Sequence, residues 1–375
     1  MIFGFFTRRG FLVAVGIVLA AMQCRGATTA DLLAQSDAII VGTPTNLSVR
    51  PDGLAFGLRV ATWLSPVQPA GGAPLQLLWD GLSAHQREGY RLPTAPKPGI
   101  WFLKNLGNGF YRPLRVRFPE VALPDLYLAA AASTGCPAEF RHSMSDSLPD
   151  RIALEVLCEA SMQDGSTGTE YTPQGGCDAT SGLSVSPRMR AAFMYLAAMS
   201  GSRQKATGFA CLISANDTRG ILLLEQHLNE LTIQDTARMA GPVGGWRNAD
   251  PAALGSLGRI AVRPPTSGPL LKSAIEALTA IHTVETIPWL DKLMDRPETD
   301  GQIQAMAGIL SFVNGYPIRT AENFRNMSFM QPSHTPYSDD DTWKSIGPRR
   351  DATDADIRTS VVLWKAWLRT KRLVP

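Results

Sequence analysis

Residues 270–314, LLKSAIEALTAIHTVETIPWLDKLMDRPETDGQIQAMAGILSFVN, carry the clearest fold signal in the chain. Apolar residues recur there at the helical period, as in Leu271, Ile275 and Leu278, so each helix has one face that must be buried. The stretch predicts three short helices joined by tight turns. Such short connections favour antiparallel packing of successive helices.

Two local signals predict where these helices begin. Thr286 precedes Pro288, and we expect its hydroxyl to cap the second helix because proline is tolerated in a first turn. Thr299 and Gln302 have the spacing of a capping box, which predicts the start of the third helix. Gly315 is placed to end that helix.

Residues 277–310, ALTAIHTVETIPWLDKLMDRPETDGQIQAMAGIL, resemble a HEAT-type repeat, with its order of helix, tight turn, Ile-Pro-x-Leu helix, acidic turn and helix. Residues 210–228 echo this pattern weakly, as an earlier repeat would. The resemblance implies stacked helix pairs that present a surface to partners. An ordinary helical bundle without true repeats remains the alternative.

The N-terminus has the features of an export signal. Arg8 and Arg9 precede the apolar run Phe11–Met22, which is too short for a membrane span but suits a signal-peptide core. Residues 7–12, TRRGFL, resemble a twin-arginine signal, and the general export route is the alternative. We therefore expect residues 1–26 to be a signal peptide and the protein to be periplasmic or secreted, with no membrane contact beyond export or an uncleaved signal anchor.

Composition limits the class of partner. The chain is 45% hydrophobic and only 18% charged, so it can fill sizeable cores. Loss of Arg8, Arg9 and Arg25 with the signal would make its basic and acidic residues equal in number. A neutral chain has no electrostatic footprint for nucleic acid or anionic membranes. We expect protein partners and no nucleic acid.

Four cysteines remain after Cys24 of the signal: Cys136, Cys158, Cys177 and Cys211. An even number in an exported chain predicts two disulfides, whose three connectivities the sequence leaves open. Cys158 and Cys211 lie in helical apolar patterns, where a buried free thiol would also fit. No CxxC spacing supports the rival zinc site.

Residues 31–120 are expected to form a β-rich domain, either a small barrel or a sandwich. The predicted strands are Ala38–Val41, Leu54–Leu64, Leu75–Trp79, Ile100–Leu103 and Phe110–Val116. Asn108-Gly109 predicts a tight hairpin between the last two. The pattern SDAIIVG at 36–42, followed by GIWFL at 99–103, is similar to netrin-like or OB-like modules, although the paired cysteines common in that group are missing here.

The rest of the chain is expected to be helical, which makes the fold class α+β. Residues 121–185 are predicted to be a connection of helices and loops that contains cysteines, with helices at 122–132 and 148–162. Residues 186–375 are predicted to be the HEAT-like domain. Its further predicted helices are 189–199, 204–214, 219–231, 252–260 and one that Thr353 caps.

No stretch carries a recognisable catalytic or metal-binding pattern. The five histidines, His85, His142, His227, His282 and His334, have no metal-ligand spacing. Cys136 could act as a nucleophile with His142, but a disulfide suits an exported chain better. The carboxylates at 339–341 and at Asp351, Asp354 and Asp356 do not match a calcium loop. We therefore expect no catalytic residue, no cofactor and no metal.

The sequence favours an exported, non-enzymatic binding or scaffold protein that uses a helical repeat surface. Two alternatives remain open. The chain could be an envelope hydrolase whose residues converge only in three dimensions, or a protease inhibitor that acts through the β module.

Overall fold

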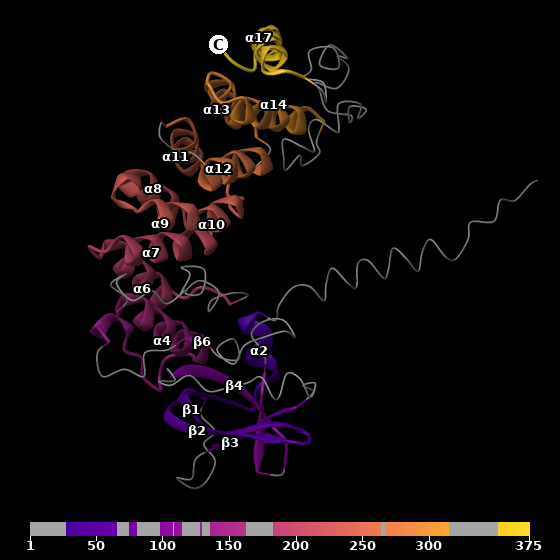
Figure 1. The fold of residues 1–375 in the computed structure, drawn as a ribbon. Coiled ribbons are helices and arrows are strands. Elements are labelled where there is room, and N and C mark those ends of the chain that lie inside the picture. Colours follow the sequence, from indigo (N-terminus) through magenta and orange to yellow (C-terminus); the bar gives the residue numbers. More distant parts are fainter. Residues whose placement is uncertain are drawn as a thin grey trace, which may run out of the picture. The chain divides into compact units, whose positions relative to one another are not determined.

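The computed structural model describes residues 28–65, 75–80, 98–107, 109–114, 128–129, 136–162, 183–263, 268–281, 283–314 and 352–375. The chain forms two compact units (Figure 1). Unit 1 comprises Met1–Met162 and Asp178–Met189, and unit 2 comprises Gln163–Cys177 and Arg190–Pro375. The described strands lie in unit 1 and unit 2 is helical, which confirms the α+β class. The signal peptide, 1–26, lies outside the described residues.

Five strands of unit 1 pair in a closed ring, which makes the β-rich domain a barrel. The strands are β1 (Ala38–Arg50), β2 (Gly53–Trp63), β3 (Leu75–Asp80), β4 (Gly99–Asn105) and β5 (Phe110–Pro113). Their order is β1-β2-β3-β5-β4 and back to β1. The β3–β5 pair is parallel and the other pairs are antiparallel. All five strands were predicted, and each overlaps its expected range.

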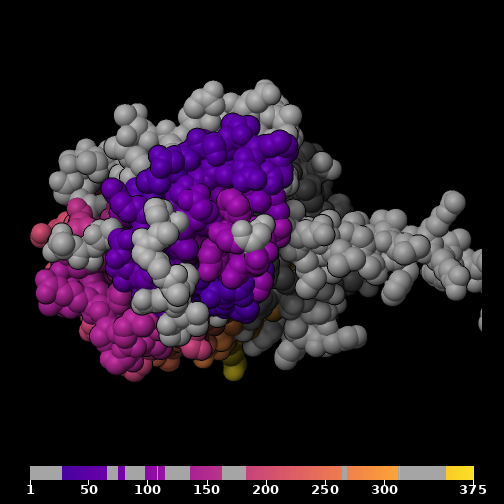
Figure 2. All heavy atoms as spheres, turned by 90° about the horizontal axis from the view of Figure 1, so that it is seen from below, coloured from indigo at the N-terminus to yellow at the C-terminus, as the bar shows by residue number. Residues whose placement is uncertain are grey.

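Alternate residues of these strands point into the barrel and form its core. The core residues are Ala38, Ile40, Leu54, Phe56, Leu58, Leu75, Leu77, Trp79, Trp101 and Leu103. Trp101 is fully buried, and its indole Nε1 donates a hydrogen bond to the Gly42 carbonyl at 2.9 Å. This bond satisfies the one polar atom of the indole and ties β4 to β1. Figure 2 shows β1 and β2, in indigo, beside β4 and β5, in purple.

The predicted β4–β5 hairpin is present. Asn105 pairs with Tyr111, and the Leu106 amide donates to the Phe110 carbonyl at 3.0 Å. Gly107 and Gly109 have φ of 76° and 81°, a backbone region that glycine adopts without strain. Asn108 itself lies outside the described residues.

Two short elements at the barrel differ from the prediction. Leu128–Ala129 form strand β6 on the edge of β4, whereas the sequence predicted a helix over 122–132. Pairing with an available strand edge overrides the helical propensity of these residues. Helix α2 (Thr29–Gln35) was not predicted, although Thr28 and Asp31 form its capping box and it packs on β4.

Unit 1 continues with η2 (Ala138–Phe140) and α4 (Leu148–Met162), and α4 has the predicted bounds. Helix α6 (Pro187–Ala198) follows. The elements of unit 2 are α7 (Ser202–Ser214), α8 (Thr218–His227), η3 (Leu228–Glu230), α9 (Ile233–Arg238), α10 (Ala240–Gly244), α11 (Pro251–Val262), α12 (Gly268–Ile281), η4 (Val284–Thr286), α13 (Ile287–Leu293), α14 (Thr299–Asn314) and α17 (Asp354–Thr370).

The helices of unit 2 stack in two rows (Figure 1). In one row, α8 packs on α11 and α11 on α13. In the other, α7 packs on α10, α10 on α12, α12 on α14 and α14 on α17. Contacts of α7 with α8, α11 with α12 and α13 with α14 join the rows. Helices 270–314 are therefore one part of a longer stack.

Local caps in the stack match the sequence in one place and differ in two. Thr353 caps α17 in a capping box with Asp356, as predicted for Thr353. Thr286 does not cap α13, because η4 already holds it in helical conformation and its hydroxyl donates to Thr283. Gln302 forms no capping box with Thr299, because its Oε1 atom has no hydrogen-bond partner among the described residues. Its amide donates to the carbonyls of Met294 and Arg296 and so holds the turn before α14.

Asp217 joins two helices, α8 and α6. Its carboxylate accepts from the Arg219 amide at the start of α8, at 3.1 Å. It also binds the guanidinium groups of Arg219 and of Arg190 on α6, each at 2.6 Å. Hydrogen bonds from Arg219 first, and then from Arg190, lower the pKa of Asp217 to about 2 against the opposing effect of burial.

Replacing Asp217 with asparagine should lower the stability of unit 2 at neutral pH. Because the pKa is lowered on folding, the ionised Asp217 stabilises the fold above pH ~4 and loses this effect as the pH falls towards about 2. Asp217→Asn keeps the helix cap but removes the charge, and should cost about 2 kcal/mol at pH 7. Urea unfolding at pH 7, 4 and 2 measures this. A loss of the same size at pH 2 would contradict the assignment.

Candidate functional site

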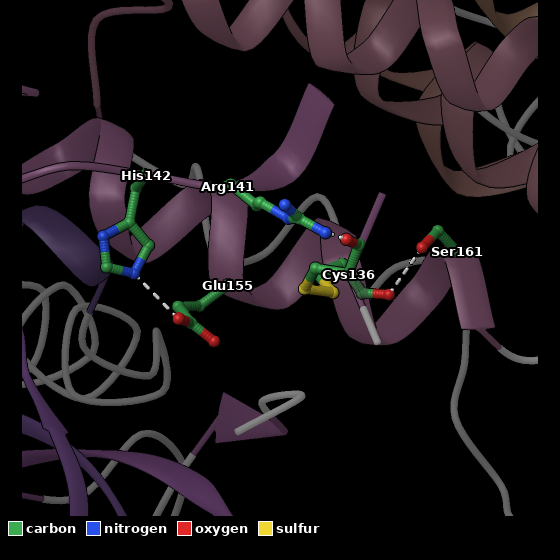
Figure 3. The surroundings of a disulfide bond; sticks show 6 residues. Cys136, Arg141, His142, Glu155 and Ser161 are labelled. Carbon is green, nitrogen blue, oxygen red and sulfur yellow. Dashed lines mark hydrogen bonds and ion pairs between the residues drawn. A yellow bond between two sulfur atoms is a disulfide. The ribbon is translucent and has the colours of Figure 1, made fainter. Parts of the chain in front are cut away.

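The most densely cross-linked part of unit 1 lies where the segment 136–147 meets α4 (Figure 3). Cys136 and Cys158 form a disulfide with a Cα–Cα distance of 5.5 Å. This bond settles one pairing that the sequence left open. It also removes Cys136 from the role of a nucleophile with His142, because a disulfide sulfur is not a thiolate.

A buried ion pair also joins segment 136–147 to α4. His142 Nε2 lies 2.7 Å from Glu155 Oε1, and the two side chains are only 13% and 7% exposed. Figure 3 shows them facing each other to one side of the disulfide. Glu155 Oε2 is buried and has no hydrogen-bond partner among the described residues. The buried carboxyl group of Glu155 therefore relies on His142 for its hydrogen bond, since a buried polar group without a partner is costly.

Further hydrogen bonds fix the backbone around this contact. Arg141 Nε donates to the Cys136 carbonyl at 3.2 Å, and Arg151 Nη1 lies 3.1 Å from the Met144 sulfur. Ser147 precedes α4 and caps its first turn, because its hydroxyl accepts from the Asp150 amide at 3.2 Å. We use the name α4 clasp for the disulfide together with the His142–Glu155 pair.

The remaining predicted cysteines are not part of the clasp. Cys211 is a free, buried thiol in α7, which is the second interpretation that the sequence allowed for it. The fully packed surroundings of α7 residues 206–213 suit a small apolar side chain there. Cys177 lies outside the described residues. In the part of the chain that the structure describes, no three His, Cys, Asp or Glu side chains are grouped to hold a metal.

The other residues considered as catalytic or metal-binding candidates lie on different elements of the structure. His227 pairs with Glu230, Nδ1 to Oε1 at 2.7 Å, and its ring stacks on Phe209. Asp354 and Asp356 lie in the first turn of α17. The described ranges do not include His85, His282, His334, Asp351 or residues 339–341.

Sequence reasoning missed the role of Glu155, although a signal was present. In the run IALEVLC, residues 152–158, Glu155 is the single charged residue among apolar neighbours that are all buried. A lone carboxylate in such a run must find a partner when the helix packs. What the sequence could not show is that this partner is His142.

A second candidate is the outward face of the row α8–α11–α13 in unit 2, which we call the outer row. Glu225 of α8 and Arg259 of α11 form a two-bond ion pair at 2.5 and 2.9 Å. Leu222 is 36% exposed on α8. On α13 the Lys292 ammonium lies 4.6 Å from the centroid of the half-buried Trp289 ring. The other row also has exposed apolar side chains, such as Val362 of α17, which is 66% exposed.

Comparison with known proteins identifies no relative: no family model, no curated protein and no solved structure matches the chain. The resemblances to HEAT-type and netrin-like or OB-like proteins therefore stay predictions. Among the described helices, none is both long enough and apolar enough to cross a membrane.

Removing one member of the buried His142–Glu155 pair should lower the free energy of unfolding far more than removing both members. His142→Ala leaves the Glu155 carboxylate buried without a described partner, and should cost roughly 3–5 kcal/mol of unfolding free energy. The double variant His142→Leu with Glu155→Leu leaves no buried charge and should be more stable than the single variant. Urea unfolding with the disulfide intact compares them. A single variant as stable as the parent would show that the pair is not a buried charge pair.

Proposed function

We propose that this is an exported, non-enzymatic protein that binds a protein partner through the outer row, as a scaffold or recognition component in the periplasm or outside the cell. The observation that carries the proposal is the two-row stack, in which the row α8–α11–α13 keeps an exposed stripe that includes Leu222 and Lys292. Regularly stacked helices present such stripes as one extended surface, and proteins built this way use it for binding.

The composition of the outer row supports a protein partner. Leu222 and Trp289 offer apolar contact, and aromatic residues are frequent in the energetic centres of protein interfaces. The charge of Arg259 is matched by Glu225, so the surface is not a basic track of the kind that follows a phosphate backbone. The stacking of α11 to α14 also supports the HEAT-like resemblance that the sequence suggested.

Features of unit 1 support export and the nature of the β module. The Cys136–Cys158 disulfide is typical of chains that reach an oxidising compartment, in agreement with the signal-like residues 1–26. The ring order of the strands, with β3 parallel to β5, supports an OB-like barrel. The basic residues Lys104 and Arg112 pair with Asp37 and Asp80, so we assign the barrel a structural role.

Charge substitutions on the outer row should abolish partner capture. The bait is the chain that begins at residue 27, used with an extract of the source envelope, and the test variant is Leu222→Glu with Lys292→Glu. Both side chains are exposed on the outer row, so the fold should persist. The control is Ile233→Glu on α9, where the side chain is 90% exposed and outside the row.

We expect a protein that is retained by the parent and by Ile233→Glu, and lost with the double variant. Equal retention by all three baits would contradict binding through the outer row.

A further inference from the structure

The α4 clasp contains two links between segment 136–147 and α4, a disulfide bond and an ion pair. Both links join the same two pieces of chain, because Cys136 and His142 lie in segment 136–147 while Glu155 and Cys158 lie on α4. We propose that the His142–Glu155 pair docks this segment on α4 before the disulfide forms, so that the two cysteines meet in a chain that is already folded and still reduced.

The spacing of the four residues allows the ion pair to hold the two cysteines close together. Glu155 and Cys158 are three residues apart on one helix and therefore share a face. On the other piece, Arg141 Nε donates to the Cys136 carbonyl and fixes the backbone between Cys136 and His142. When His142 contacts Glu155, Cys136 is therefore placed next to Cys158. The two cysteines are 22 residues apart in sequence, and docking spares them a search through the conformations of the intervening loop.

Burial gives the docked segment a measurable consequence. Cys158 is 0% exposed and Cys136 is 4% exposed. In a reduced chain whose segment stays docked, the Cys158 thiol is covered and reacts slowly with reagents in solution. Release of the segment would uncover it.

The oxidation that follows needs only a small disulfide, R–S–S–R, as oxidant. The thiolate of Cys136, the less buried cysteine, attacks one sulfur of R–S–S–R and releases one R–S⁻. The thiolate of Cys158 then attacks the Cys136 sulfur of this mixed disulfide and releases the second R–S⁻. Two protein thiols are oxidised, one R–S–S–R is reduced to two thiols, and the two protons of the cysteines pass to these leaving groups or to solvent. Docking accelerates the second step, because it holds Cys158 beside Cys136.

The ion pair should favour formation of the disulfide by the same free energy by which the disulfide favours the ion pair, because coupling between two equilibria is reciprocal. Docking of segment 136–147 takes place within unit 1 and is independent of partner binding at the outer row in unit 2.

Alkylation of the reduced chain tests the proposal. The whole protein is reduced, freed of reductant, and treated with iodoacetamide at neutral pH, and each cysteine is followed by peptide mass mapping. The variants are His142→Gln and, as a matched control, His227→Gln, which removes the other described His–Glu contact at the same 2.7 Å distance. Buried Cys211 reports whether unit 2 stays folded, and near-UV circular dichroism, to which Trp79 and Trp101 of the barrel core contribute, reports on unit 1.

We expect Cys158 of the reduced parent and of His227→Gln to react at least roughly tenfold more slowly than in urea, and His142→Gln to restore most of that rate while Cys211 stays slow. If Cys211 also becomes fast, or the near-UV circular dichroism of the parent is lost, the variant has unfolded. Glu155→Gln, which retains a hydrogen-bonding side chain, then replaces it with the same expectation for Cys158. The proposal is overturned if Cys158 of the reduced parent reacts as fast as in urea, or if a folded clasp variant leaves its rate unchanged.

Discussion

Close contact between the backbones of neighbouring helices is the constraint on which unit 2 depends. A methyl group placed on Gly208 of α7 would lie 2.3 Å from the backbone nitrogen of Ala197 on α6. At Gly220 of α8 it would lie 2.7 Å from the backbone nitrogen of Ile213 on α7. Glycine is the one residue that leaves room for such an approach, and the apolar stripes of adjacent helices interlock because the helices lie this close.

Unit 1 is held together by different means. Its barrel closes through strand pairing and a core of alternating residues, and the Trp101 indole ties β4 to β1. Outside the barrel, segment 136–147 has little regular structure of its own, and it is fixed to α4 by the clasp. The molecule therefore combines a cross-linked N-terminal unit with a helical unit in which each helix rests on its neighbours.

The sequence predicted elements that have a strong period and missed those that depend on tertiary contact. Strands such as β4, and the stripe Ile357–Leu368 of α17, were readable because burial imposes their periodicity. The strand at 128–129 was not, because pairing with β4 determines it. In the same way, the cysteine count predicted disulfides, whereas the partnership of Glu155 with His142 required knowledge of how two separate segments pack.

Substitution of two helical glycines tests the close packing of unit 2 most directly. Gly208→Ala places a methyl group against the backbone of α6, while at Gly255 of α11 the nearest atom is the flexible end of Arg259, 3.2 Å away. Both changes improve helix propensity by up to about 1 kcal/mol. In urea unfolding we expect Gly208→Ala to be destabilised by roughly 1–3 kcal/mol through overpacking, and Gly255→Ala to be unchanged or more stable. Equal stabilisation of both variants would contradict the packing described for the stack.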